Sequence, residues 1–305
     1  MSKLTQSNLG YVFAVAAFVG VTYDCALTFG QEVELVWRQR WSLMTVLYLG
    51  VRYLGILYAA LTILLAAPTI SLSDTVSWIV YVVQNSTGVF VFAMLFVIII
   101  TRLHAMYQGS RKILIFLVAT FLAINIFDAV VLIMTTINTS GEEFILSGTY
   151  QCQINYPDDI SLLNSTTWIL GTVWEVLALC LAGWIAVKHF RELRRYSAEG
   201  IIGDCFSVLI KTHMVYFASF VAVSGFNLIV DLSPSLLTSQ NFLEAQALMG
   251  SLQILTVVQA FVLGPRLILG VREYHAKLMA DSDAASGMTS IAFQERVHVS
   301  TSSSV

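Results

Sequence analysis

Charged residues are scarce in this sequence. Asp, Glu, Lys and Arg make up 11% of its 305 residues, while 57% are hydrophobic, and soluble domains carry about 25% charged residues. The composition therefore excludes an ordinary soluble domain. The four Cys residues match neither a disulfide framework nor a zinc site. A formal net charge of −3 argues neither for nor against a polyanionic partner. Because the sequence has neither a glycine-rich phosphate loop nor a basic aromatic surface, we expect no nucleic acid partner.

Long apolar runs are what the sequence has instead. They cover residues 9–29, 43–67, 77–101, 113–136, 166–187, 206–230 and 246–270. A helix of about 20 residues crosses a bilayer core about 30 Å thick, and these runs are too continuously apolar for the strands of a membrane barrel. The sequence predicts an all-α membrane protein, a bundle of seven transmembrane helices within residues 9–279. A short outer tail at 1–8 and a disordered cytosolic tail at 280–305 are expected to flank it.

Positive charges predict the orientation. Fourteen of the sixteen Lys and Arg residues fall on one side of the predicted spans, and cytosolic loops accumulate these residues. The amino terminus is therefore expected outside and the carboxyl terminus in the cytosol, in the plasma membrane or another membrane of the secretory pathway. Sequons at Asn138 and Asn164 fall near the long outer loop and are candidate N-glycosylation sites.

One segment, residues 22–53, has a distinctive pattern. It holds an Asp near a helix end, paired tryptophans and an Arg-Tyr pair inside the second run: Asp24, Trp37, Trp41, Arg52 and Tyr53. This segment resembles the domain of unknown function 6533 of basidiomycete fungi. The other matching positions are Tyr23, Thr28, Glu32, Val33, Ser42 and Tyr48, with Gly264, Pro265, Arg266 and Leu267 as later landmarks. The resemblance implies an integral membrane protein with about seven spans and no assigned activity.

The tryptophans of this segment also have a physical interpretation. Val33, Val36 and Trp37 recur at helical spacing, with Trp41 one turn further. Tryptophan favours the headgroup level of a membrane, where its ring is shielded and its N–H is wet. We expect a short interfacial helix that Trp37 and Trp41 anchor.

Charges inside the predicted spans are costly, at least about 2.5–3.5 kcal/mol at the membrane centre. Asp24 in the first run and Arg52 in the second differ in depth by only about 6 Å at 1.5 Å per residue. They are expected to form an ion pair between adjacent antiparallel helices. A pair that locks the two helices together is the simpler interpretation, and a pair that moves as a switch is the alternative.

A second set of polar residues lies in the predicted outer half. Asp128 in the fourth run and Glu175 in the fifth have nearly equal depths, Asn125 lies one turn from Asp128, and Asn85 lies at a similar depth in the third run. Together they are expected to line a polar cavity. Two carboxyl groups there would hold a cationic ligand or a proton. Alternatively, each group is simply hydrogen-bonded within the bundle.

The sequence contains no motif that indicates enzyme activity. The five His residues are not placed with carboxylates at one depth, as an intramembrane metal site requires, and neither G-x-S-x-G nor H-E-x-x-H occurs. The last run has no Lys for a retinal Schiff base. We therefore expect no enzyme activity, no cofactor and no metal site.

The basic side carries candidate contacts for a cytosolic signalling protein or for anionic lipid. These are Arg102, Arg191, Arg194 and Arg195. The simpler interpretation is that they only set the topology. The leading functional hypothesis is receptor-like sensing of a small molecule through the outer cavity. The alternatives are a proton- or ion-coupled transporter of small solutes and a membrane scaffold without a ligand.

Overall fold

A computed structural model describes residues 2–67, 73–107, 109–138, 140–146, 149–155, 158–196, 201–232, 242–274, 276 and 279. Its elements are α1 (Ser2–Glu32), the π-helical turn η1 (Val33–Trp37), α2 (Leu43–Ala66), α3 (Asp74–Met106), α4 (Arg111–Asn138), β1 (Ser140–Leu146), β2 (Thr149–Asn155), α5 (Asp158–Tyr196), α6 (Ile201–Leu232), α8 (Phe242–Val258) and the π-helical turn η2 (Gln259–Leu263). The helix that contains α8 and η2 continues through residues 264–274.

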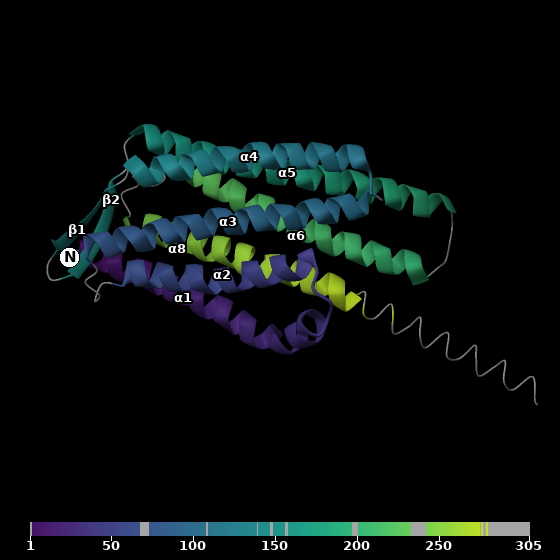
Figure 1. The fold of residues 1–305 in the computed structure, drawn as a ribbon, viewed down its shortest axis with the longest axis horizontal. Coiled ribbons are helices and arrows are strands. Elements are labelled where there is room, and N and C mark those ends of the chain that lie inside the picture. Colours follow the sequence, from purple (N-terminus) through teal and green to yellow (C-terminus); the bar gives the residue numbers. More distant parts are fainter. Residues whose placement is uncertain are drawn as a thin grey trace, which may run out of the picture.

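The helices run side by side along the long axis of the molecule (Figure 1), and their contacts join them in a closed ring. Each helix from α1 to α6 packs against the next one along the chain, and α8 contacts both α6 and α1. The turn η2 contacts α1, α2, α3 and α6, so it lies in the interior. The bundle is helical, as predicted. A hairpin of β1 and β2, paired from Ser140 with Asn155 to Leu146 with Thr149, stands at one end beside α3 in place of the expected loop.

Among the described residues, six helices are long and apolar enough to cross a membrane. They are Leu9–Trp37, Leu43–Ala66, Asp74–Met106, Arg111–Asn138, Leu162–Lys188 and Glu244–Tyr274. The predicted sixth run lies in α6, where the described apolar stretch, Met214–Val230, is shorter. Length and composition therefore support an integral membrane protein.

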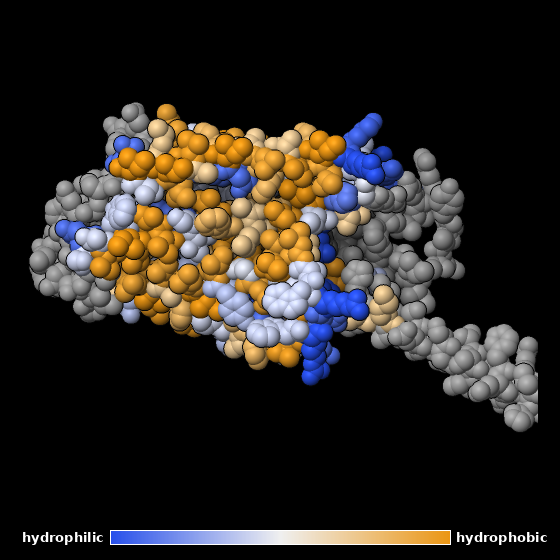
Figure 2. Space-filling view, in the orientation of Figure 1, coloured by the Kyte–Doolittle hydropathy of each residue, from blue (hydrophilic) through white to orange (hydrophobic). Residues whose placement is uncertain are grey.

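The surface of the bundle fits a lipid environment. Figure 2 shows a broad hydrophobic belt, with strongly hydrophilic side chains gathered mainly at the end away from the hairpin. On α4, for example, Ile115, Ile126 and Ile133 are 68%, 63% and 58% exposed. An exposed apolar surface of this extent is unusual for a soluble protein and marks contact with lipid or another protein.

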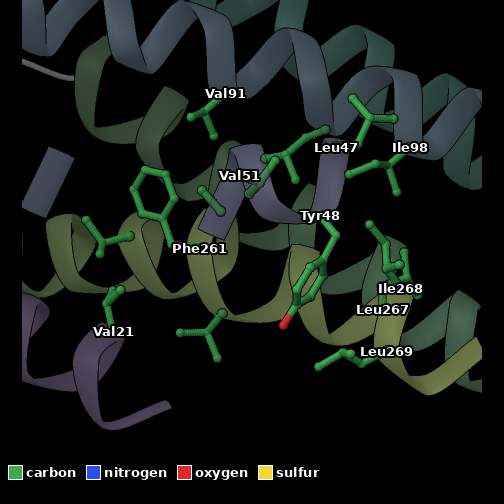
Figure 3. Close-up of a cluster of buried hydrophobic side chains, with 14 of the residues drawn as sticks. Val21, Leu47, Tyr48, Val51, Val91, Ile98, Phe261, Leu267, Ile268 and Leu269 are labelled. Atoms are coloured by element: carbon green, nitrogen blue, oxygen red, sulfur yellow. The ribbon is translucent and has the colours of Figure 1, made fainter. Parts of the chain in front are cut away.

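Buried side chains hold α1, α2 and α3 to the helix that carries η2. Figure 3 shows Tyr48, Val51 and Ile98 among Phe261 and Ile268, all of which belong to one core cluster. A second cluster joins α3, α4 and α5 around the fully buried Trp174. Because the packed interior tolerates little change of volume, these clusters fix the positions of the helices that carry the polar residues described below.

Two local features bring η2 close to α2. A Cβ atom at Gly55 would lie 2.5 Å from Cδ1 of Phe261, so only glycine permits this approach of the Phe261 ring to the α2 backbone. The π-helical turn itself directly precedes Gly264 and Pro265. Proline lacks an N–H and clashes with the preceding helical turn, and a π-helical turn is a common way for a helix to adjust to such a disruption.

Several expected boundaries differ from the structure. Helix α1 begins at Ser2, so the residues expected as an outer tail are helical. Asn138 is the last residue of α4, and Asn164 lies on α5 rather than in a loop, because the polar residues before the fifth run extend its helix. The predicted tail at 280–305 lies outside the described residues.

Candidate functional site

The end of the bundle away from the hairpin holds a buried network of charged side chains around Arg52. On α1, Asp24, Thr28 and Glu32 are spaced four residues apart, so they share one face of the helix. Arg52 of α2 is 1% exposed and reaches all three. Its Nε lies 2.8 Å from Glu32 Oε2 and its Nη1 lies 3.6 Å from Asp24 Oδ2, while Nη2 donates to Thr28 Oγ1 and to the Cys25 carbonyl.

Glu32 has partners on both of its oxygens. Oε1 accepts hydrogen bonds from Trp37 Nε1 and from the Tyr53 hydroxyl, each at 3.0 Å. Oε2 accepts a hydrogen bond of 3.3 Å from the Tyr48 hydroxyl besides its contact with Arg52. The bond to Trp37 joins residues five apart, and the wider η1 turn brings residues with this spacing to the same side of the helix. A carboxylate with four donors around it is well compensated for burial.

Asp24 is held by a second arginine, from the helix that follows η2. Arg266 Nη2 and Nε lie 2.6 and 2.7 Å from Asp24 Oδ1. The side chain of Arg266 is 45% exposed, whereas that of Asp24 is 5% exposed. Two carboxylates and two guanidinium groups therefore balance in charge and connect three helices. We call Asp24, Thr28, Glu32, Arg52 and Arg266 the Arg52 network.

The structure places the predicted pair, Asp24 and Arg52, in contact, but this pair is only part of the network. Glu32 and Arg266 were not predicted as partners of this pair. Both were named only as positions of the family resemblance, since Glu32 follows the first apolar run, which ends at Phe29, and Arg266 belongs to the basic residues that predict the topology. The available signals were the four-residue spacing from Asp24 to Glu32 and the position of Arg266 inside the last run.

A cavity of about 460 Å³ occupies the half of the bundle toward the hairpin. It lies between the first parts of α3 and α5, the ends of α2, α4 and α6, and the second half of α8 with η2. Its floor includes the tilted rings of Tyr58 and Phe261, whose centroids are 5.4 Å apart. The polar side chains that line it are those of Tyr58, Tyr81, Gln84, Asn85, Asp128, Thr135, Asn164, Thr167, Trp168, Thr172, Glu175, Ser224, Asn227, Gln253 and Thr256.

Three of the four predicted cavity residues line this space: Asn85, Asp128 and Glu175. The fourth, Asn125, is not in the lining, and its Nδ2 donates to the Phe121 carbonyl of its own helix. The contributions of α6 and α8, such as Asn227 and Gln253, were not predicted. Isolated amides in the sixth and seventh runs were the only signal for them.

The two acidic residues of the cavity are poorly compensated. Glu175 is 5% exposed and accepts a hydrogen bond from Ser224, but its Oε2 is buried without a hydrogen-bond partner in the described part of the chain. Asp128 Oδ1 is buried and likewise lacks a partner among the described residues. Most buried polar atoms in proteins are hydrogen-bonded, so such atoms require an explanation.

The remaining predicted residues are distributed over the basic end. Trp37 and Trp41 are 59% and 77% exposed, but Trp37 belongs to η1 and its indole serves the Arg52 network, while Trp41 follows the helix. Arg191 is exposed on α5. Arg194 and Arg195 also lie on α5, and their side chains are outside the described part of the structure.

Arg102 is half-buried near the end of α3, and its Nε has no hydrogen-bond partner within the described ranges. Its charge interacts with that of Arg272, which donates to the Leu35 carbonyl and to Thr45 Oγ1 at 2.9 and 2.7 Å. Arg272 therefore ties the end of the last helix to the connection between α1 and α2. In the part of the chain that the structure describes, no group of three or more His, Cys, Asp or Glu residues is arranged to hold a metal ion.

Residues 12–57 match the model of a family described as a family of unknown function (DUF6533). The match is to a family without an assigned activity. The DUF6533 segment contains every member of the Arg52 network except Arg266, together with Trp37, Tyr48 and Tyr53. The cavity lining, by contrast, begins at Tyr58 and lies entirely outside it. No curated protein matches the chain.

Proposed function

We propose that this chain is a receptor-like membrane protein that binds a small molecule in the cavity of the hairpin half. The observation that carries the proposal is that Asp128 and Glu175, from different helices, line one cavity and each present a buried oxygen without a partner in the described structure. The volume of about 460 Å³ falls within the range of about 300–1,000 Å³ typical of small-molecule sites.

Burying these two carboxyl groups without full hydrogen bonding costs free energy. Burying an uncompensated polar group costs about 1–3 kcal/mol by mutational measures, and an ion costs more. Inside a membrane, acidic residues typically line cavities or proton paths. A ligand that supplies the missing hydrogen bonds would recover this cost in the bound state, which makes the cavity a better binding site than an apolar one of the same size.

The arrangement in the membrane forms part of the proposal. We take α6 as a seventh span, since the whole helix has 32 residues, and place the hairpin outside because the Lys and Arg residues gather at the other end. The cavity then faces outward, in the plasma membrane or another membrane of the secretory pathway of a fungus. The cytosolic arginines would contact a signalling protein, and the chain would have no enzyme activity.

A thermal-shift screen of the purified protein against a diverse metabolite panel tests the proposal. A ligand at one hundred times its dissociation constant adds about 2.7 kcal/mol of stability, which is readily measured. We expect a stabilising compound whose effect is lost in Glu175→Gln and in Asp128→Asn. The matched control is Asn125→Ala, one turn from Asp128 but outside the lining, which should respond like the parent protein.

The same screen separates the proposed role from its alternatives. If a compound stabilises the protein and is also taken up by vesicles that contain it, the chain is a carrier rather than a receptor. If no compound stabilises the parent, or if the hit is retained in both acidic-site variants, ligand binding in this cavity is refuted. A scaffold function would then be the better hypothesis.

A further inference from the structure

We infer that the ligand of this cavity is an organic cation, a protonated amine with an apolar body, held by Asp128 and Glu175. The inference rests on the proposed function, since it names the chemical class of molecule that the same site would bind. The inference comes from the charges, the hydrogen-bond donors and the aromatic surface of the described lining.

The charge of the cavity has one sign. Its described lining contains two carboxyl groups and no Lys, Arg or His. Arg52 and Arg266 are instead committed to the Arg52 network, in the opposite half. A cationic ligand would supply the opposite charge that the lining lacks, whereas an anionic ligand would face repulsion in a low-dielectric space.

The hydrogen bonds made by the lining also favour a cationic ligand. Side chains of the lining spend their donors on protein partners: Thr167 and Thr172 donate to the carbonyls of Asn164 and Trp168, and Ser224 donates to Glu175. What these groups leave toward the cavity is mainly acceptor capacity. A ligand that donates hydrogen bonds suits these groups.

Two amide groups of the lining follow this pattern. Asn227 Nδ2 donates to the Val223 carbonyl and to Thr256 Oγ1, at 3.0 and 3.1 Å. Gln84 Nε2 donates to Thr62 Oγ1 at 2.9 Å. The amide oxygens of Asn227 and Gln84 are therefore the groups left to interact with a ligand, and an ammonium group is a donor with three N–H bonds and no acceptor.

Aromatic side chains complete the site. Phe92 and Trp168 line the cavity in an edge-to-face arrangement, with centroids 6.3 Å apart, and Tyr58 and Phe261 form part of its floor. Aromatic faces attract cations and also pack against an apolar body. Since the described residues offer no cluster of metal ligands and the cavity is far larger than an ion, an organic cation fits better than a metal ion.

The test uses three matched series of probes with the same phenylalkyl body: phenylalkylamines, phenylalkanols and phenylalkanoates. Binding is measured by isothermal titration on the full chain in nanodiscs of phosphatidylcholine, a lipid without net charge that does not attract amines electrostatically, with empty nanodiscs as the baseline. We expect amines to bind at least about tenfold more tightly than the matched alcohols, which corresponds to about 1.4 kcal/mol, and alkanoates to bind most weakly.

Variants show whether this preference comes from the cavity. In Glu175→Gln and Asp128→Asn the advantage of the amine over the alcohol should shrink or vanish, while Asn125→Ala should keep it. If alcohols bind as tightly as amines to the parent protein, the cationic ligand is refuted while the cavity remains a binding site. If none of the three series binds, or if Glu175→Gln and Asp128→Asn both keep the full amine preference, binding of a cation in this cavity is refuted as well.

Discussion

Glu32 and Glu175 are both almost completely buried, at 1% and 5% exposed, yet their surroundings differ. Glu32 faces a guanidinium group, two tyrosine hydroxyls and an indole N–H. Glu175 receives one hydrogen bond from Ser224 and leaves Oε2 without a partner among the described residues. The difference separates a charge whose partners are supplied by the fold from one whose partner must come from elsewhere.

The two regions also differ in their relation to the matched family. The Arg52 network lies almost wholly within the DUF6533 segment, while the cavity lies outside it. The buried charges of the Arg52 network pair with one another. Because these partners come from the fold itself, the network suits a structural role. Function belongs to particular sites rather than to a fold as a whole, and the uncompensated cavity is the site in this chain that we propose for a ligand.

Substitution of Arg52 should have the largest effect on the stability of the Arg52 network. Arg52→Met would leave Asp24 and Glu32 buried with fewer partners, and breaking a buried ion pair on one side typically costs about 3–5 kcal/mol. We expect a loss of this size in the free energy of unfolding, measured by chemical denaturation in micelles. Arg266→Met serves as the control, because the exposed Arg266 side chain should cost clearly less. Equal losses in the two variants would contradict a network centred on Arg52.

The close contact between Gly55 of α2 and Phe261 of η2, which lies between the Arg52 network and the cavity, offers a second test. Gly55→Ala would bring a Cβ atom to 2.5 Å from Phe261, and overpacking of this kind typically costs about 1–3 kcal/mol. We expect thermal unfolding at a lower temperature, with the Phe261 ring displaced toward the cavity. Gly20→Ala is the matched control on α1, where no atom lies within 4 Å, and it should be neutral or stabilising. A Gly55→Ala protein as stable as the parent would mean that the close approach does not occur.

A smaller effect is expected from a single donor to Glu32. Tyr48→Phe keeps the buried ring beside Arg52, whose guanidinium carbon lies 5.7 Å from the ring centroid, and removes only the hydroxyl. Hydrogen bonds between membrane helices contribute about 1 kcal/mol, so we expect a loss of that order in denaturation experiments. Tyr23→Phe, at a residue that is 64% exposed, should have almost no effect. An unchanged stability of Tyr48→Phe would show that Glu32 does not depend on this donor.

Much of the fold could be predicted from the sequence, because long apolar runs directly reflect the thickness of a bilayer. Depth along each run was also predictable, since every residue adds a fixed rise, and this is why Asp24 and Arg52, or Asp128 and Glu175, could be matched in advance. Rotation about each helix axis was not predictable. For this reason Asn125 was expected in the cavity lining, whereas the structure places it outside the lining.

The contacts that the last helix makes could not be predicted from the sequence either. The ring is closed by α8 against α1, a contact between segments more than 200 residues apart that no local pattern encodes. It brings Arg266 to Asp24 and adds Gln253 and Thr256 to the cavity. Likewise, the π-helical turn η1 could not be seen in a sequence read with the period of an α-helix, although it orients Trp37 toward Glu32.

The most direct test of the account is one substitution made in both regions. Glu32→Gln and Glu175→Gln change the same atoms at two buried sites, and the free energy of unfolding of each is measured beside the parent without added ligand. We predict a loss of about 2 kcal/mol or more for Glu32→Gln, because bonds to a charged group are worth about 1.5–3 kcal/mol each, and no loss for Glu175→Gln, whose buried charge is relieved. Equal losses at the two sites would contradict the claim that the fold compensates one acid and leaves the other for a ligand.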